Sequence, residues 1–80
     1  MIITVEISYY PLTENYSEAI NSFLEKISKS NITIEVGMMS TVLIGEYKII
    51  FELLNNSIYK LMEDYSSVFN MKISNSCPIK

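Results

Sequence analysis

This 80-residue chain has no histidine and no arginine, so the side chains that could do chemistry are carboxylates, hydroxyls, tyrosines, six lysines and one cysteine. Without histidine there is no Ser-His-Asp or Cys-His set for nucleophilic catalysis. The single cysteine, Cys77, provides neither a zinc site nor an internal disulfide. No arginine is present to cradle a phosphate, and two glycines, Gly37 and Gly45, do not make a phosphate-binding loop. The functions that remain possible are acid–base catalysis by carboxylates and the binding of a small molecule.

Carboxylates remain as candidates for catalysis, and Glu6, Glu35 and Glu46 fall on or beside the expected strands. A small enzyme acting through Glu6 or Glu46 is one interpretation. Glu46 also stands where a helix is expected to begin, and there the helix dipole favours a negative charge without any catalytic role. We expect a non-catalytic binding protein with no cofactor and no metal.

Charge and hydropathy argue against two classes of binding partner, nucleic acids and membranes. The net charge is −3, and the six basic residues are all lysines, so the chain lacks the basic face of a nucleic-acid binder. No apolar run approaches the roughly 18 residues of a membrane span, and the first residues lack the basic segment of a secretory signal. We expect a cytoplasmic protein that binds neither nucleic acid nor membrane.

Hydrophobic periodicity predicts six elements in one domain, 1–80. Alternation of apolar and polar residues predicts strands at 2–10, 32–36, 40–44 and 68–75. Apolar residues three and four apart predict helices at 15–30 and 47–65. Asn15 followed by Glu18 resembles a capping box at the start of the first helix. Gly45 is expected to end the third strand.

The order β-α-β-β-α-β predicts a ferredoxin-like α+β fold. Two interleaved strand-helix-strand units with right-handed crossovers give a four-stranded antiparallel sheet with both helices on one face. The other face would be open, as a ligand surface, a subunit interface or both. The predicted core comprises Ile3, Val5, Ile7, Ile20, Phe23, Leu24, Ile27, Ile34, Phe51, Leu54, Ile58, Met71 and Ile73.

The apolar content exceeds what a core of this size needs. Hydrophobic residues make up 49% of the chain, with six tyrosines and five methionines. Met38 and Met39 stand side by side at the expected hairpin turn, and flexible thioethers suit an adaptable apolar contact, either with a ligand or with a second subunit. Tyr9 and Tyr10 point to opposite sheet faces, so one of them is expected in the core. Part of the apolar surface is therefore expected to be buried in a homo-oligomer.

Three segments resemble a known family. They are Glu6-Ile7-Ser8-Tyr9-Tyr10-Pro11-Leu12, Met39-Ser40-Thr41-Val42-Leu43-Ile44-Gly45-Glu46 and Asn70-Met71-Lys72-Ile73. Their order and spacing look like the small thiamine-binding proteins of ferredoxin-like fold, long a family of unknown function. The resemblance covers almost the whole chain, and Thr-x-x-x-Gly-Glu is its most specific part.

The resemblance implies binding of thiamine or its hydroxymethylpyrimidine part, and assembly as dimers or tetramers through the sheet. Carried onto this chain, it places ligand contacts at Ser8, Tyr10, Thr41 and Glu46. Thr41 would donate to a pyrimidine nitrogen and Glu46 would pair with an amino group or cationic ring. Ser8 and Tyr10 would supply polar and stacking contacts. The alternative is a structural or regulatory interaction module whose sheet only assembles subunits.

Overall fold

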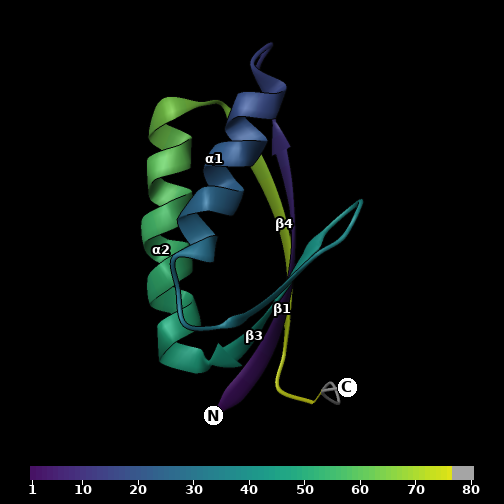
Figure 1. The fold of residues 1–80 in the computed structure, drawn as a ribbon, viewed down its shortest axis with the longest axis vertical. Helices are drawn as coiled ribbons and strands as arrows, with labels where there is room; N and C mark the ends of the chain where they lie inside the picture. Colours follow the sequence, from purple (N-terminus) through teal and green to yellow (C-terminus); the bar gives the residue numbers. More distant parts are fainter. Residues whose placement is uncertain (77–80) are drawn as a thin grey trace.

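The computed structural model describes residues 1–76 as a four-stranded antiparallel sheet with two helices on one face, so the predicted ferredoxin-like fold is confirmed. Cys77 lies outside the described residues. In chain order the elements are β1 (Ile2–Pro11), α1 (Tyr16–Ser28), β2 (Thr33–Val36), β3 (Thr41–Glu46), α2 (Tyr47–Asp64) and β4 (Ser67–Ser74). The strands lie side by side in the order β2-β3-β1-β4, and each neighbouring pair is antiparallel. Figure 1 shows α1 and α2 packed on the same side of the sheet, with the β2–β3 turn projecting away from it.

Alternation along β1 creates the centre of the core. Ile3, Val5, Ile7 and Tyr9 are buried beneath the helices, whereas Tyr10 points to the other face and is exposed. A strand whose successive side chains point to opposite faces buries every second residue when one face is covered. The expectation that one of Tyr9 and Tyr10 belongs to the core is thus confirmed, and the core residue is Tyr9.

The predicted core is largely confirmed. Six of its residues are buried: Ile3, Val5, Ile7, Phe23, Ile27 and Leu54. Five more are half-buried against it: Ile20, Leu24, Ile34, Phe51 and Ile58. The structure adds Tyr9, Ala19, Leu43, Ile50 and Leu61, which the prediction left out.

The prediction was wrong at Met71 and Ile73 in β4. Their register partners in β1 are Ile7 and Val5, so both do lie on the helix-covered face as expected. They remain 39% and 47% exposed because β4 is the outer strand of the sheet, and the helices do not extend over its outer side. Hydrophobic alternation identifies the face of a strand, whereas burial depends on whether the strand lies at the centre or the edge.

Gly45 does not end β3, as the sequence had suggested. The strand continues through it to Glu46, and Gly45 pairs with Ile3. A Cβ atom at position 45 would lie 2.8 Å from Cγ2 of Ile32, closer than real Cβ contacts. Glycine at this position therefore lets Ile32 approach the strand, and its role is close packing rather than termination.

The first helix begins without a capping box. Asn15 occupies the cap position, but its side chain makes no capping hydrogen bond. Glu18 instead accepts a hydrogen bond of 2.9 Å from the hydroxyl of Tyr65, which follows α2. This contact with the carboxylate raises the pKa of Tyr65, because it favours the protonated phenol. Glu18 thus connects the two helical segments rather than completing a cap.

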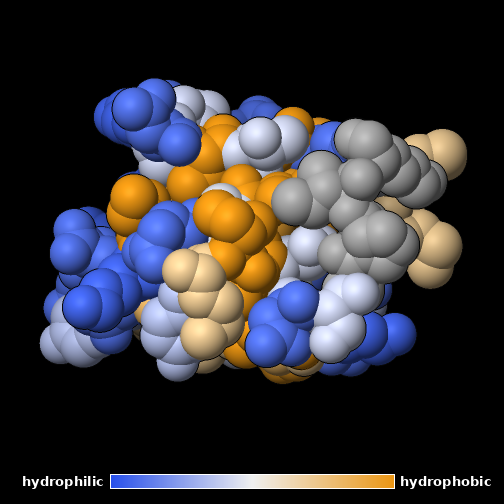
Figure 2. All heavy atoms as spheres, turned by 90° about the horizontal axis from the view of Figure 1, so that it is seen from below, coloured by the Kyte–Doolittle hydropathy of each residue, from blue (hydrophilic) through white to orange (hydrophobic). Residues whose placement is uncertain are grey.

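The second helix is continuous across Asn55, Asn56 and Ser57, as the in-phase apolar residues predicted. None of the helices among residues 1–76 is long and apolar enough to cross a membrane. Figure 2 shows the end of the molecule at which β1 and α2 begin, with hydrophobic residues in the middle and hydrophilic ones around them. Apolar side chains thus reach the surface there as well as filling the interior.

Candidate ligand-binding cavity

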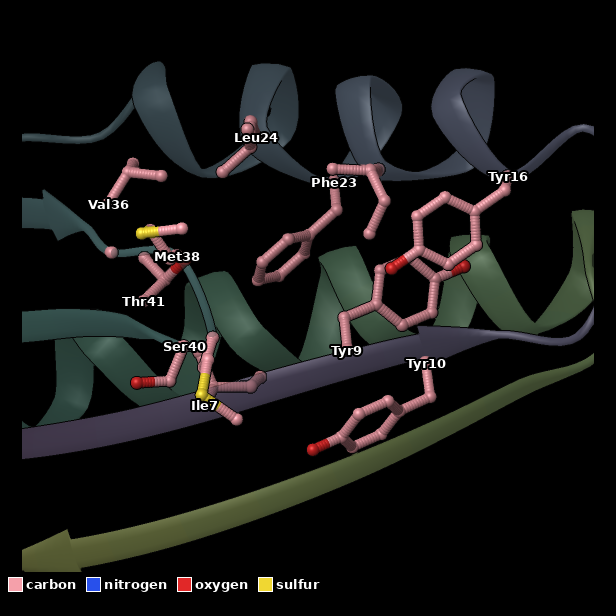
Figure 3. Close-up of a pocket in the computed structure, with 13 residues that line it drawn as sticks. Ile7, Tyr9, Tyr10, Tyr16, Phe23, Leu24, Val36, Met38, Ser40 and Thr41 are labelled. Atoms are coloured by element: carbon pink, nitrogen blue, oxygen red, sulfur yellow. The ribbon is translucent and has the colours of Figure 1, made fainter.

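A hollow of about 430 Å³ lies between α1, the second half of β1 and the turn that joins β2 to β3. Its volume falls in the range of about 300–1,000 Å³ that is typical of small-molecule sites. Figure 3 shows Tyr16 at one end of the hollow and Val36, Met38 and Thr41 at the other. We call this hollow the α1 cavity.

Aromatic rings form one wall of the α1 cavity. Tyr9 from β1 and Phe23 from α1 point toward each other across the helix-sheet interface, with ring centroids 5.5 Å apart. Tyr9 is fixed from behind, since its ring stacks on Phe69 at 4.5 Å and its hydroxyl lies 3.0 Å from Oγ of Ser67. A held ring of this kind offers a rigid surface to a flat ligand.

Thr41 brings a hydroxyl into this apolar surrounding. It is the first residue of β3, pairs with Ile7 and is only 6% exposed. Its helix-side orientation follows from the register, which places Thr41 and Leu43 on the same face as the buried residues of β1. Among residues 1–76, the Thr41 hydroxyl forms no hydrogen bond, and no side-chain oxygen or nitrogen that is fully buried lacks a partner. The hydroxyl oxygen is therefore not fully enclosed by the protein. The hydroxyl is therefore free to serve a ligand.

The β2–β3 turn covers one end of the α1 cavity. Gly37 donates to the carbonyl of Ser40 at 2.9 Å, which closes the turn, and Met38 and Met39 stand outward from it. Two side chains hold the turn to the sheet from the open face. The hydroxyl of Ser8 donates to the carbonyl of Met39 at 3.2 Å. The hydroxyl of Ser40 donates to Glu6 at 3.0 Å.

The structure separates the four residues that the resemblance had marked as ligand contacts. Thr41 lines the α1 cavity, and Tyr10 borders it although its ring lies on the opposite side of β1. Ser8 contacts the cavity's turn from the open face. Glu46 lies five residues beyond Thr41 at the other end of β3, about 17 Å away along an extended strand. Glu46 is thus outside the cavity.

Glu46 caps α2. Its Oε1 accepts a hydrogen bond of 2.9 Å from the backbone N–H of Lys48, and its Oε2 lies 3.3 Å from the amino group of Met1. The backbone hydrogen bond from Lys48 lowers the pKa of Glu46, partial desolvation opposes this effect, and the contact with the amino group lowers it further. The sequence-based interpretation of Glu46 as a residue that begins a helix is confirmed.

Sequence reasoning missed the part that α1 plays in the cavity. Tyr16, Ile20, Phe23 and Leu24 all line it, whereas the apolar periodicity indicated only a helix face packed on the core. Their one signal was the surplus of large apolar residues in so short a chain. No group of three or more acidic, histidine or cysteine side chains within residues 1–76 is placed to hold a metal ion.

Solved structures share this fold. A protein from Thermotoga maritima whose name proposes a role in thiamine biosynthesis/salvage is 26% identical, with a TM-score of 0.85 over 95% of this chain and 85% of that one. A protein from Streptococcus pneumoniae is 19% identical, with a TM-score of 0.85 over 92% of this chain and 86% of that one. A domain of unknown function from Bacillus cereus is 20% identical, with a TM-score of 0.81 over 100% of this chain and 83% of that one. At 19% and 20% identity, the similarity to the last two proteins shows only that they share the fold.

Family membership rests on almost the entire chain. No curated protein matches it. The model of the YKOF-related family, however, matches residues 2–80, which include both helices, all four strands and the residues of the α1 cavity. The chain therefore belongs to the YKOF-related family.

Proposed function

We propose that the α1 cavity binds thiamine or its hydroxymethylpyrimidine part and that the protein carries out no reaction on it. The observation that carries the proposal is the cavity itself, which combines a fixed aromatic wall with the hydroxyl of Thr41, a residue that is 6% exposed. The Thermotoga maritima relative, which is named for thiamine biosynthesis/salvage, supports this choice of ligand class.

A pyrimidine ring matches the two kinds of surface that the cavity offers. Its flat faces would pack against Tyr9 and Phe23, since offset and edge-on contacts between aromatic rings are favourable. Thr41 would then supply the polar contact that sets the orientation of the ring, because a hydroxyl both donates and accepts hydrogen bonds. Met38 at the turn would adapt to the remainder of the ligand.

The absence of charged side chains in the cavity lining favours some forms of such a ligand over others. None of the 13 residues that line the cavity is acidic or basic. A phosphate ester would enter without a cationic partner, and burying an unpaired charge is costly. The cationic ring of thiamine would meet the faces of tyrosines, which attract cations. We therefore expect the unphosphorylated compounds to bind better than their phosphate esters.

The uncharged lining also supports a role without catalysis. Proton transfer in enzymes commonly uses histidine, a carboxylate, lysine, cysteine or tyrosine. Of these, only tyrosines border the α1 cavity. Glu6 is engaged by Ser40 on the open face, and Glu46 caps α2, so the two carboxylates that an enzyme would have used have structural partners.

Within this proposal the four marked residues have different roles. Thr41 contacts the ligand and Tyr10 contributes to the rim of the cavity. Ser8 acts indirectly, by holding the turn through the carbonyl of Met39. Glu46 contributes to the stability of α2 and makes no ligand contact.

Calorimetric titration with hydroxymethylpyrimidine, thiamine and thiamine phosphate tests the proposal. We expect saturable binding in the micromolar range, equivalent to about −8 kcal/mol, for the first two compounds. Thr41→Val keeps the shape of the side chain and removes the hydroxyl, so affinity should fall by about tenfold, the value of one lost hydrogen bond.

Thr4→Val is the matched control, because it makes the same change in β1 opposite Ile44, away from the cavity. It should bind like the unchanged protein. Absence of binding heat at several temperatures, with the protein folded and its oligomeric state intact, would contradict the proposal and favour the alternative of an interaction module.

A further inference from the structure

The β2–β3 turn forms a large part of the α1 cavity. Residues 36–41 supply six of the 13 residues that line it, among them Met38 and Thr41. Figure 3 shows these side chains at one end of the hollow, with Tyr16 at the other. A change in the position of the turn would therefore move almost half of the lining, including the hydroxyl of Thr41.

The turn is weakly held by its own residues. One backbone hydrogen bond, from Gly37 to the carbonyl of Ser40, closes it and leaves Met38 and Met39 at the tip. Two-residue hairpin tips usually have a positive φ at one or both residues, which matches the twist of the strands. None of the residues that the structure describes has a positive φ. Met38 and Met39 are 104% and 87% exposed, and a segment that buries so little apolar surface opens easily.

Two side chains of β1 hold the turn from the open face of the sheet. Ser8 donates to the carbonyl of Met39 at 3.2 Å, and Ser40 donates to Glu6 at 3.0 Å. Val42 is the register partner of Glu6, so Ser40, two residues earlier, is a diagonal neighbour within reach of a long side chain. The bond to Glu6 is the stronger of the two, because a carboxylate is a better acceptor than a carbonyl.

Glu6 has no direct access to the α1 cavity. Its neighbours Val5 and Ile7 are buried on the helix-covered side, so the side chain of Glu6 points to the open face. There its Oε2 accepts from Ser40, and its Oε1 lies 4.0 Å from Nζ of Lys72. The Lys72 side chain is 82% exposed, and an ion pair of this kind contributes little. Ser40 is thus the contact through which Glu6 can act on the cavity.

We propose that Glu6 is a positioning residue of the α1 cavity, because its carboxylate holds Ser40, and with it the β2–β3 turn, from the opposite face of the sheet. Thr41, the next residue, then keeps its hydroxyl beneath α1, and Met38 keeps its place at the end of the cavity. Loss of this contact lowers the fraction of molecules whose cavity is ready for a ligand, and the apparent affinity falls with that fraction. The inference rests on the proposed function for its ligand, whereas the hold on the turn is measurable without one.

A double-mutant cycle measured by calorimetry with hydroxymethylpyrimidine tests the role of Glu6. Glu6→Ala and Ser40→Ala each remove one partner of the same hydrogen bond, so each should weaken binding by about three- to tenfold. The double variant should bind no more weakly than either single variant, because both changes break the same contact. Glu6→Gln keeps an oxygen that can accept from Ser40, so it should bind within about twofold of the unchanged protein.

Lys72→Ala is the matched control, since it removes the other partner of Glu6 and leaves Ser40 in place. It should bind like the unchanged protein. Additive losses in the double variant, or an equal loss in Lys72→Ala, would overturn the inference. Circular dichroism checks that every variant is folded, and if Glu6→Ala did not fold, Ser40→Ala would report on the same contact.

Amide hydrogen exchange of the ligand-free protein separates this inference from the proposed function. The N–H of Gly37 is bonded to Ser40, so its exchange rate reports opening of the turn. This rate should rise about three- to tenfold in Glu6→Ala and Ser40→Ala, while the amides of α2 exchange as before. If the unchanged protein bound none of the compounds, the proposed function would fail, and exchange at Gly37 would still decide whether Glu6 positions the turn. An unchanged rate at Gly37 in both variants would show that it does not.

Discussion

Glu46 illustrates how one side chain takes its role from the backbone around it. It ends β3 and immediately precedes α2, so its carboxylate accepts the N–H of Lys48 and lies beside the amino group of Met1. Negative charge is favourable at the beginning of a helix, where backbone N–H groups lack partners. The Gly-Glu pair that marks the family resemblance is thus explained here by packing against Ile32 and by capping of α2.

A pH dependence of stability follows from the lowered pKa of Glu46. Because the folded state has the lower pKa, its stabilising contribution is complete above the unfolded value of about 4.5 and is lost as the pH falls through the folded value. Glu46→Gln should unfold at lower urea concentration than the unchanged protein at neutral pH, and the difference should shrink in acid. Urea midpoints measured across this range test the expectation.

Glu35→Gln is the control for this measurement, since it removes the same charge from β2 without affecting the end of a helix. Its urea midpoint should follow that of the unchanged protein. If Glu46→Gln also followed it at every pH, the capping role assigned to Glu46 would be wrong.

At the scale of elements, central and edge strands with similar sequence patterns have different environments. β1 lies between β3 and β4 and buries five of its ten residues, whereas β4 has one neighbour and leaves Met71 and Ile73 exposed. Each helix covers a different part of the sheet. α1 forms the cavity with the β2–β3 turn, and α2 forms a second hollow with Met71 of β4.

The junction between α1 and the sheet should be the most sensitive to truncation. Phe23 is 2% exposed and packs against both Tyr9 and Phe69. Phe23→Ala should lower the free energy of unfolding by about 3–5 kcal/mol, much of the stability of so small a domain. Ile49→Ala, at a half-exposed position of α2, should cost far less. Chemical denaturation compares the two, and a loss below about 1 kcal/mol for Phe23→Ala would show that the ring is not part of the core.

At the scale of the whole molecule, the α1 cavity depends on β4 as well as on the elements that line it, since Tyr9 of the cavity wall stacks on Phe69 of β4. Thr41 in β3 and Met71 in β4 are separated by β1, a distance of two strand spacings or about 10 Å. β4 therefore supports the aromatic wall of the cavity from behind, although none of its residues lines the cavity.

The sequence by itself determined the order of elements, the face of each strand and most of the core, because these depend on local periodicity. Alternation in β1 and spacing in α1 are sufficient to identify Ile7 and Phe23 as interior. The composition of the sequence also excluded catalysis that needs histidine or a metal bound by several thiols. The interpretation of Glu46 as the start of a helix likewise needed only its position before an amphipathic segment.

Only the tertiary structure decided what depends on contacts between distant segments. The register of β3 against β1 places Thr41 beside Ile7 under α1 and leaves Glu46 at the opposite end of the strand. The position of β4 at the edge exposes Met71, although its pattern is that of a core residue. Side chains that share a sequence motif can be separated by a whole strand length, because a strand extends about 3.3 Å per residue.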